Sequence, residues 1–117
     1  MTHSIRTALL AVTTASLMAA PALAAPQDAA LVKKGQQVYT AQKCQQCHSV
    51  AGKGSKKSPL DGVGTKLSVD EIRKWITHPI EMAAQTKSTK KPEMKDKYGK
   101  LPAADIDALV AYMQSLK

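Results

Sequence analysis

The sequence has few aromatic residues and little acidic charge. It holds no phenylalanine, one tryptophan and three tyrosines, and its 17 lysines and arginines outnumber 9 aspartates and glutamates, for a formal charge of +8. A small chain so poor in large apolar rings builds a thin core, and small domains commonly need a disulfide, a metal or another staple. We therefore expect something bulky and apolar to be supplied from outside the chain.

The sequence also lacks an apolar run long enough to cross a membrane. Its N-terminal apolar stretch is shorter than the ~18 residues that a span requires. Residues 1–24 instead have the layout of a secretory signal peptide, with an early cation (Arg6), the apolar stretch and small residues up to Ala24. We expect cleavage there, leaving residues 25–117 as one periplasmic domain without a stable membrane anchor. Because no Arg-Arg pair is present, the general secretory route is favoured.

Three segments, residues 28–42, 68–79 and 102–117, show the apolar periodicity of amphipathic helices, and no strand pattern is convincing. In the second segment, Ser68 and Glu71 have the spacing of a capping box. The residues expected on the buried faces are Leu31, Gly35, Val38 and Gln42 in the first helix, Ile72, Trp75 and Ile76 in the second, and Ile106, Leu109, Val110, Met113 and Leu116 in the third.

Residues 48–67 and 80–100, which separate these helices, show no periodicity, and Pro79 is expected to end the second helix. Two loops of about twenty residues are unusual in so small a domain unless they serve a purpose, such as wrapping a large ligand. The pattern predicts an all-α fold of three main helices with long loops around that ligand.

Both cysteines lie in the motif Cys44-Gln45-Gln46-Cys47-His48, which matches C-x-x-C-H, the attachment sequence of c-type haem. In that chemistry each thiol forms a thioether with one haem vinyl group, and the histidine becomes an axial ligand of the iron. The motif predicts one covalent haem c, with Cys44 and Cys47 as attachment points and His48 as a metal ligand.

Three alternatives are weaker. A zinc site needs four ligands, but only His78 remains as a further imidazole ligand in residues 25–117. A thiol–disulfide oxidoreductase usually places C-x-x-C beside a βαβ pattern, which is absent from the sequence. A structural disulfide across two residues would close a very small loop and stabilise little.

A second axial ligand is expected to be methionine, which raises the reduction potential and suits electron transfer. Met113 lies on the apolar face of the last predicted helix and is most simply a core residue. Met82 follows Pro79 too closely to cross the far face of a haem, whereas Met94 follows Pro92 and is far enough along the chain to return across it. We therefore predict Met94 as the second metal ligand.

The chain resembles the class I monohaem c-type cytochromes from about Leu31 onward. The resemblance rests on "CQQCH", "SPLDGVGTKLS", "IRKWITHP", "KPEM" and "DALVAYMQSLK". It implies the small cytochrome c fold, in which Gly35 lets the last helix cross closely near Leu109 and Tyr112. It also implies that the carbonyl of Pro59 accepts the ring N–H of His48, and that Trp75 lies near the haem or the Met94 sulfur.

Lysines flank the segments expected to bind the haem, and a basic rim around its exposed edge would steer acidic partners toward it. Nucleic acid is not expected as a partner, since aromatic residues do not alternate with the basic ones. The lysines concerned are Lys33, Lys34, Lys43, Lys53, Lys56, Lys57, Lys90, Lys91, Lys95 and Lys97.

The favoured function is a monomeric periplasmic electron carrier, not an enzyme, that meets redox partner proteins with acidic docking surfaces. The alternative is a haem subunit of a periplasmic oxidoreductase complex, for example one that oxidises sulfur compounds. A haem enzyme or gas sensor with an open distal site is a third hypothesis, which Met94 argues against.

Overall fold

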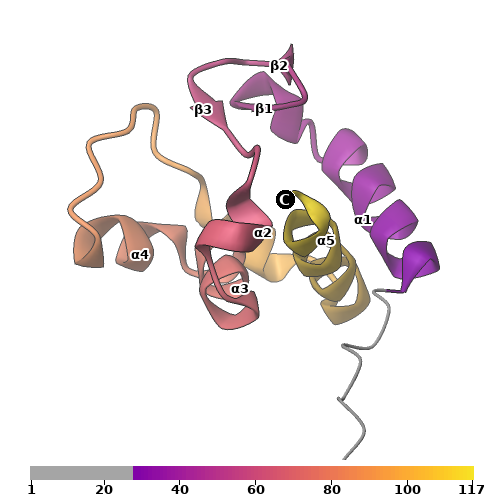
Figure 1. The fold of residues 1–117 in the computed structure, drawn as a ribbon. Helices are drawn as coiled ribbons and strands as arrows, with labels where there is room; N and C mark the ends of the chain where they lie inside the picture. The colour runs from indigo at the N-terminus through magenta and orange to yellow at the C-terminus, as the bar shows by residue number, and fades with distance from the viewer. Residues whose placement is uncertain (1–27) are drawn as a thin grey trace, which may run out of the picture.

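The computed structural model describes residues 28–117 (Figure 1), so the expected signal peptide, residues 1–24, lies outside the described residues. Within this part of the chain no helix is long and apolar enough to span a membrane. In chain order the elements are α1 (Ala29–Ala41), η1 (Cys44–Gln46), β1 (His48–Val50), β2 (Lys53–Gly54), β3 (Ser58–Pro59), α2 (Val63–Lys66), α3 (Val69–Thr77), α4 (Pro79–Gln85), η2 (Asp96–Lys100) and α5 (Ala103–Ser115).

The three predicted helices are confirmed as α1, α3 and α5. The carboxylate of Asp28 caps α1 by accepting the backbone N–H groups of Ala30 and Leu31, at 2.9 and 3.3 Å. At the start of α3, the Ser68 hydroxyl accepts the Glu71 N–H, and the Glu71 carboxylate accepts the Ser68 N–H. The capping box is therefore present, and it fixes where the second predicted helix begins.

The two segments predicted as unstructured loops contain regular structure, so that part of the prediction was wrong. Residues 48–67 hold α2 and a three-stranded sheet of order β2-β1-β3, in which β1 is antiparallel to β2 and parallel to β3. Residues 80–100 hold most of α4 and all of η2. Strands of two or three residues are too short to display an alternating pattern. Pro79 ends α3, but it also opens α4, where its missing N–H is tolerated.

Helices α1 and α5 cross closely at a glycine. A Cβ atom added to Gly35 would lie 1.9 Å from the carbonyl oxygen of Ala108 and 2.7 Å from the Cβ of Tyr112. Figure 1 shows the two helices side by side, with α3 packed on the other flank of α5. The implied role of Gly35 is confirmed, and Ala108 rather than Leu109 is the residue that the glycine approaches.

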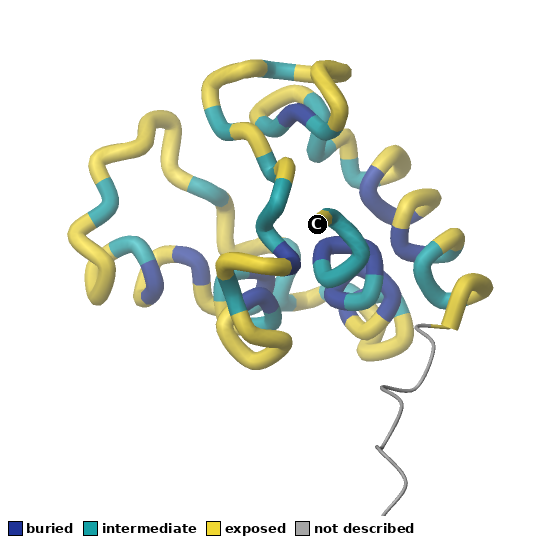
Figure 2. Tube along the Cα trace, viewed as in Figure 1, coloured by how far each residue is buried: buried dark blue, intermediate teal, exposed yellow. Residues whose placement is uncertain are grey.

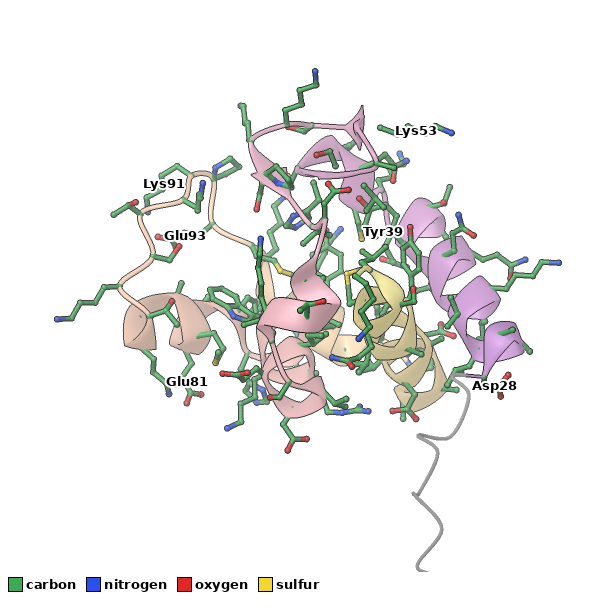
Figure 3. The ribbon with its side chains drawn as sticks, viewed as in Figure 1. Asp28, Tyr39, Lys53, Glu81, Lys91 and Glu93 are labelled. Carbon is green, nitrogen blue, oxygen red and sulfur yellow. The ribbon has the colours of Figure 1, made fainter. Side chains whose placement is uncertain are left out.

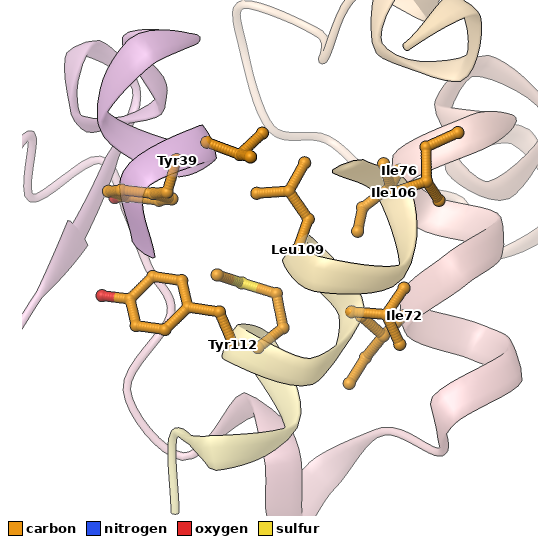
Figure 4. Close-up of a cluster of buried hydrophobic side chains, with 9 residues drawn as sticks. Tyr39, Ile72, Ile76, Ile106, Leu109 and Tyr112 are labelled. Carbon is orange, nitrogen blue, oxygen red and sulfur yellow. The ribbon is translucent and has the colours of Figure 1, made fainter. Parts of the chain in front are cut away.

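The hydrophobic core lies between α1, α3 and α5 (Figures 2 and 4), and Met113 belongs to it as expected. Trp75 was expected on the buried face of α3, but it is only half-buried and does not pack against this cluster in the described residues. The side chains of the core are Val38, Tyr39, Ile72, Ile76, Ile106, Leu109, Val110, Tyr112 and Met113.

Residues 78–98 form an excursion that leaves the core and returns to nearly the same place. Helix α4 contacts α3, and its buried residues are Pro79 and Met82. A Cβ atom added to Gly99 would lie 2.6 Å from the carbonyl oxygen of Thr77, so η2 packs directly against the end of α3. The segment that carries Met94 is thus anchored at both ends (Figure 1).

Candidate functional site

The two cysteines lie on the short helix η1, immediately after α1. Lys43 has a left-handed backbone (φ 56°) that turns the chain between the two helices. Cys44 is half-buried and packs against the core, whereas Cys47 is exposed, and both are free thiols. Burial raises the pKa of the Cys44 thiol to about 11. The motif therefore presents one thiol against the core and the other toward solvent.

The ring of His48 is held in one orientation by the neighbouring strand. Its Nδ1 donates a hydrogen bond to the carbonyl oxygen of Ser58 at 3.0 Å, which leaves Nε2 available for a ligand. The implied acceptor was the Pro59 carbonyl, and this was wrong, because the parallel register of β1 and β3 pairs His48 with Ser58. Burial lowers the pKa of His48, while the hydrogen bond to Ser58 acts in the opposite direction.

The backbone of His48 is supported from α1. The Tyr39 hydroxyl donates to the His48 carbonyl oxygen at 3.5 Å, and the Tyr39 ring meets the Tyr112 ring edge to face, with centroids 5.5 Å apart. Burial is the main cause, and a nearby charge on Cys44 the next, that raises the pKa of Tyr39 to about 12. The aromatic pair thus links the α1–α5 crossing to the strand that carries the histidine.

The two methionines of residues 80–100 differ in their surroundings. Met82 is a buried residue of α4. Met94 is half-buried on the segment between α4 and η2 and lies outside every helix and strand. The structure brings Cys44, Cys47 and His48 together in one short segment, and it places Met94 on a separate segment that makes no described hydrogen bond to them.

Tyr98 was missed at the level of the sequence, and it lies beside Lys97, one of the lysines expected to flank the haem. Tyr98 of η2 packs against the same core as Cys44, and burial, then the charges of Cys44 and Cys47, raise its pKa. The ammonium of Lys97 lies 5.1 Å from the centre of the Tyr98 ring, and its charge acts to lower the pKa of Cys44. Since residues 80–100 show no periodicity, no sequence pattern indicated that η2 would reach the cysteines.

The donor set fits a haem better than a lone metal ion. Among residues 28–117, no three His, Cys, Asp or Glu side chains cluster to hold a metal ion, so a zinc site lacks ligands. The chain instead offers two free thiols next to an imidazole whose Nδ1 is already engaged. Two thiols and one free imidazole nitrogen are the groups that covalent haem attachment uses.

Comparison with known proteins gives one family and one curated relative. The family described as cytochrome c matches residues 32–117. Cytochrome c-555 of Methylococcus capsulatus (strain Bath) is 43% identical over 74 residues, which are 62% of this chain and 59% of that protein. The chain thus spans less than two thirds of this relative's length. No solved structure showed a significant match.

Proposed function

The chain belongs to the cytochrome c family, whose cofactor is covalently bound haem c, and on that premise we propose that it is a carrier of single electrons. The proposal rests on one observation. Nδ1 of His48 is already hydrogen-bonded to the Ser58 carbonyl, and His48 directly follows a motif with two free thiols. This arrangement suits a fixed axial ligand beside two attachment points. With both thiols in thioethers and the imidazole on the iron, the motif would keep no free nucleophile or acid–base group for a reaction on a substrate.

Each residue of the motif would have a distinct role. Cys44 and Cys47 would form the two thioethers, and His48 would bind the iron through Nε2. Met94 would bind the iron through its sulfur, because it is the half-buried methionine outside a helix, whereas Met82 and Met113 already fill buried positions. When bound, haem c supplies an iron that gains or loses one electron.

The exposed lysines would favour acidic redox partners. Lys53, Lys56 and Lys57 are exposed around β2 and β3, and Figure 3 shows Lys53 at the edge of the molecule near the cysteine motif. A positive surface of this kind speeds encounter with a negatively charged partner and loses its effect as salt rises. We expect the partner to be a redox protein with an acidic docking surface, met transiently by a monomer.

The location would be the periplasm. The layout of residues 1–24 supports export by the general secretory route, with haem attached after export. Mass spectrometry of the exported protein should show an N-terminus at Ala25. An N-terminus at Met1 or Thr2 would contradict this part of the proposal.

The test of the cofactor and its ligands is an absorption spectrum of the purified protein, oxidised and reduced. We expect a sharp α-band on reduction and a weak near-infrared band from the methionine–iron bond in the oxidised form. Rapid binding of CO at neutral pH would contradict the methionine ligand. Stable co-purification with a catalytic subunit would instead support the haem subunit of an oxidoreductase complex.

A further inference from the structure

Helix α2 is fixed to the end of α5 at a buried glycine. The Gly64 N–H donates to the Leu116 carbonyl oxygen at 2.8 Å, and the Lys117 ammonium donates to the Gly64 carbonyl oxygen at 3.0 Å. A Cβ atom added to Gly64 would lie 2.2 Å from the carbonyl oxygen of Gln114. Figure 1 shows α2 beside α5. Both polar groups of the Gly64 backbone are therefore used in this contact, and a side chain there would displace it.

A second contact fixes the residue that follows α2. The side-chain amide of Gln114 donates to the Leu67 carbonyl oxygen at 3.1 Å. The side chains of Val63 and Leu67 also pack against the hydrophobic core. Helix α2 is thus held on α5 by hydrogen bonds as well as by apolar contacts.

The segment that begins at the acceptor of the His48 ring, residues 58–67, is called the strap below. The Ser58 carbonyl oxygen accepts the Nδ1–H of His48 at 3.0 Å, and the Leu60 N–H donates to the Ser49 carbonyl oxygen at 2.9 Å. One end of the strap therefore orients the histidine, and the other end is the part that is seated on α5.

A hydrogen-bonded turn connects the two ends of the strap. The Val63 N–H donates to the Leu60 carbonyl oxygen at 3.1 Å, and the Thr65 N–H donates to the Gly62 carbonyl oxygen at 3.1 Å. Gly62 has the positive φ, 74°, that this turn requires. Because the turn is closed by its own hydrogen bonds, a displacement at Gly64 is carried toward Leu60 through a contiguous network.

We infer that Gly64 is a positioning residue for the proposed axial ligand, because it seats the strap that holds the His48 ring. The hydrogen bond from Nδ1 to Ser58 makes the imidazole a more basic ligand, which favours the oxidised state of the iron when haem c is bound. A displaced strap would weaken this bond and raise the reduction potential. The effect on the potential rests on the proposed function, whereas the hydrogen bonds of the strap belong to the fold itself.

The variant that tests the inference is Gly64→Ala, whose methyl group would overlap the Gln114 carbonyl oxygen. In the reduced, ¹⁵N-labelled holoprotein, hydrogen exchange of the His48 Nδ1 proton and of the Leu60 amide should become about tenfold faster. This is the change expected when local opening has about one hydrogen bond less to break. The reduction potential of the same sample, measured by potentiometric titration, should rise.

The matched control is Gly35→Ala, the same substitution at another close approach to α5. Its methyl group would overlap the carbonyl oxygen of Ala108, on the flank of α5 that faces α1. This variant should lose stability, but its Leu60 and His48 exchange rates and its reduction potential should match the parent protein, because the strap stays seated.

A second pair of variants tests the inference even where Gly64→Ala does not fold. Gln114→Ala removes the bond to the Leu67 carbonyl oxygen and adds no bulk, so exchange and potential should change in the same direction but by less. Ser115→Ala is its neighbouring control, because the Ser115 hydroxyl donates to the Tyr112 carbonyl oxygen within α5. This control should behave like the parent protein.

Three results would overturn the inference. Unchanged exchange in the Gly64 or, if that variant does not fold, the Gln114 variant would show that the strap does not depend on its seat. Equal changes in Gly35→Ala would show that any loosening of α5 has the same effect, and faster exchange with an unchanged or lowered potential would separate the strap from the ligand. A parent protein without a reversible one-electron couple would contradict the proposed function instead, and the exchange rates would still report on the strap.

Discussion

The imidazole of His48 and the backbone carbonyl of Ser58 are joined by a hydrogen bond of 3.0 Å. Two further bonds run between the same pair of segments: Leu60 N–H donates to the Ser49 carbonyl oxygen at 2.9 Å, and Ala51 N–H donates to the Asp61 carboxylate at 2.8 Å. Residues 58–61 therefore hold residues 48–51 at three successive points. The orientation of the proposed axial ligand depends on all of this segment rather than on one acceptor.

The first prediction concerns Asp61, the only side-chain acceptor of those three bonds. Asp61→Ala should lower the free energy of unfolding by about 1–2 kcal/mol, because it removes a hydrogen bond to a charged acceptor. Urea denaturation of the holoprotein measures the loss. Asp61→Asn is the matched control, since its side-chain oxygen can still accept the Ala51 N–H, and it should lose less than half as much. Equal losses of unfolding free energy in the two variants would show that the hydrogen bond from the Ala51 N–H to the Asp61 side chain does not stabilise the fold.

The parts of the fold that could be predicted are those whose cause is local in sequence. Asp28 caps α1 by accepting the N–H of a residue two positions on. Ser68 and Glu71, three residues apart, bond each other's backbone N–H groups, so in both caps the two partners are close in sequence. The bond from His48 to Ser58 instead joins residues ten apart through strands of two and three residues. Its register is decided by tertiary pairing, which explains why Pro59 was the wrong acceptor.

The second prediction concerns the crossing of α1 and α5. Gly35→Ala should gain about 1 kcal/mol of helix propensity but lose more, because its methyl group would overlap the carbonyl oxygen of Ala108. The net loss should be about 2–3 kcal/mol in thermal or urea unfolding. Gln36→Ala, at the adjacent exposed position on the same helix, should stay within about 0.5 kcal/mol of the parent protein. A neutral Gly35→Ala variant would contradict the close approach.

The site could be predicted only as far as its motif extends. Cys44, Cys47 and His48 are adjacent in sequence, so their association needs no tertiary information. The approach of Tyr98 and Lys97 to the cysteines depends on how η2 returns to the end of α3, and nothing in residues 80–100 indicated that path. The choice between Met82 and Met94 was argued from position along the chain, and it stays a prediction.

The third prediction separates the two methionines. Met94→Ala should lower the reduction potential by a sizeable part of the roughly 0.8 V range that axial ligands cover, and should remove the near-infrared band. Met82→Ala should leave that band in place and lower the free energy of unfolding by about 2–5 kcal/mol, because it empties a buried position. Redox potentiometry and denaturation of both variants give the answer. Loss of the band in Met82→Ala alone would reverse the assignment.

The last prediction is a pH dependence at the start of α3. The Ser68 backbone N–H, and then its hydroxyl, hold the pKa of Glu71 below its ordinary value of 4.5. A lowered pKa in the folded state stabilises the protein fully above pH 4.5, and this stabilisation disappears as the pH falls through the folded-state pKa. Glu71→Gln cannot ionise, so the stability difference between parent and variant should be constant from pH 7 to about 5 and should shrink below pH 4.5 in urea denaturation. A difference that stayed constant down to pH 3 would show that the Glu71 charge plays no part in the cap.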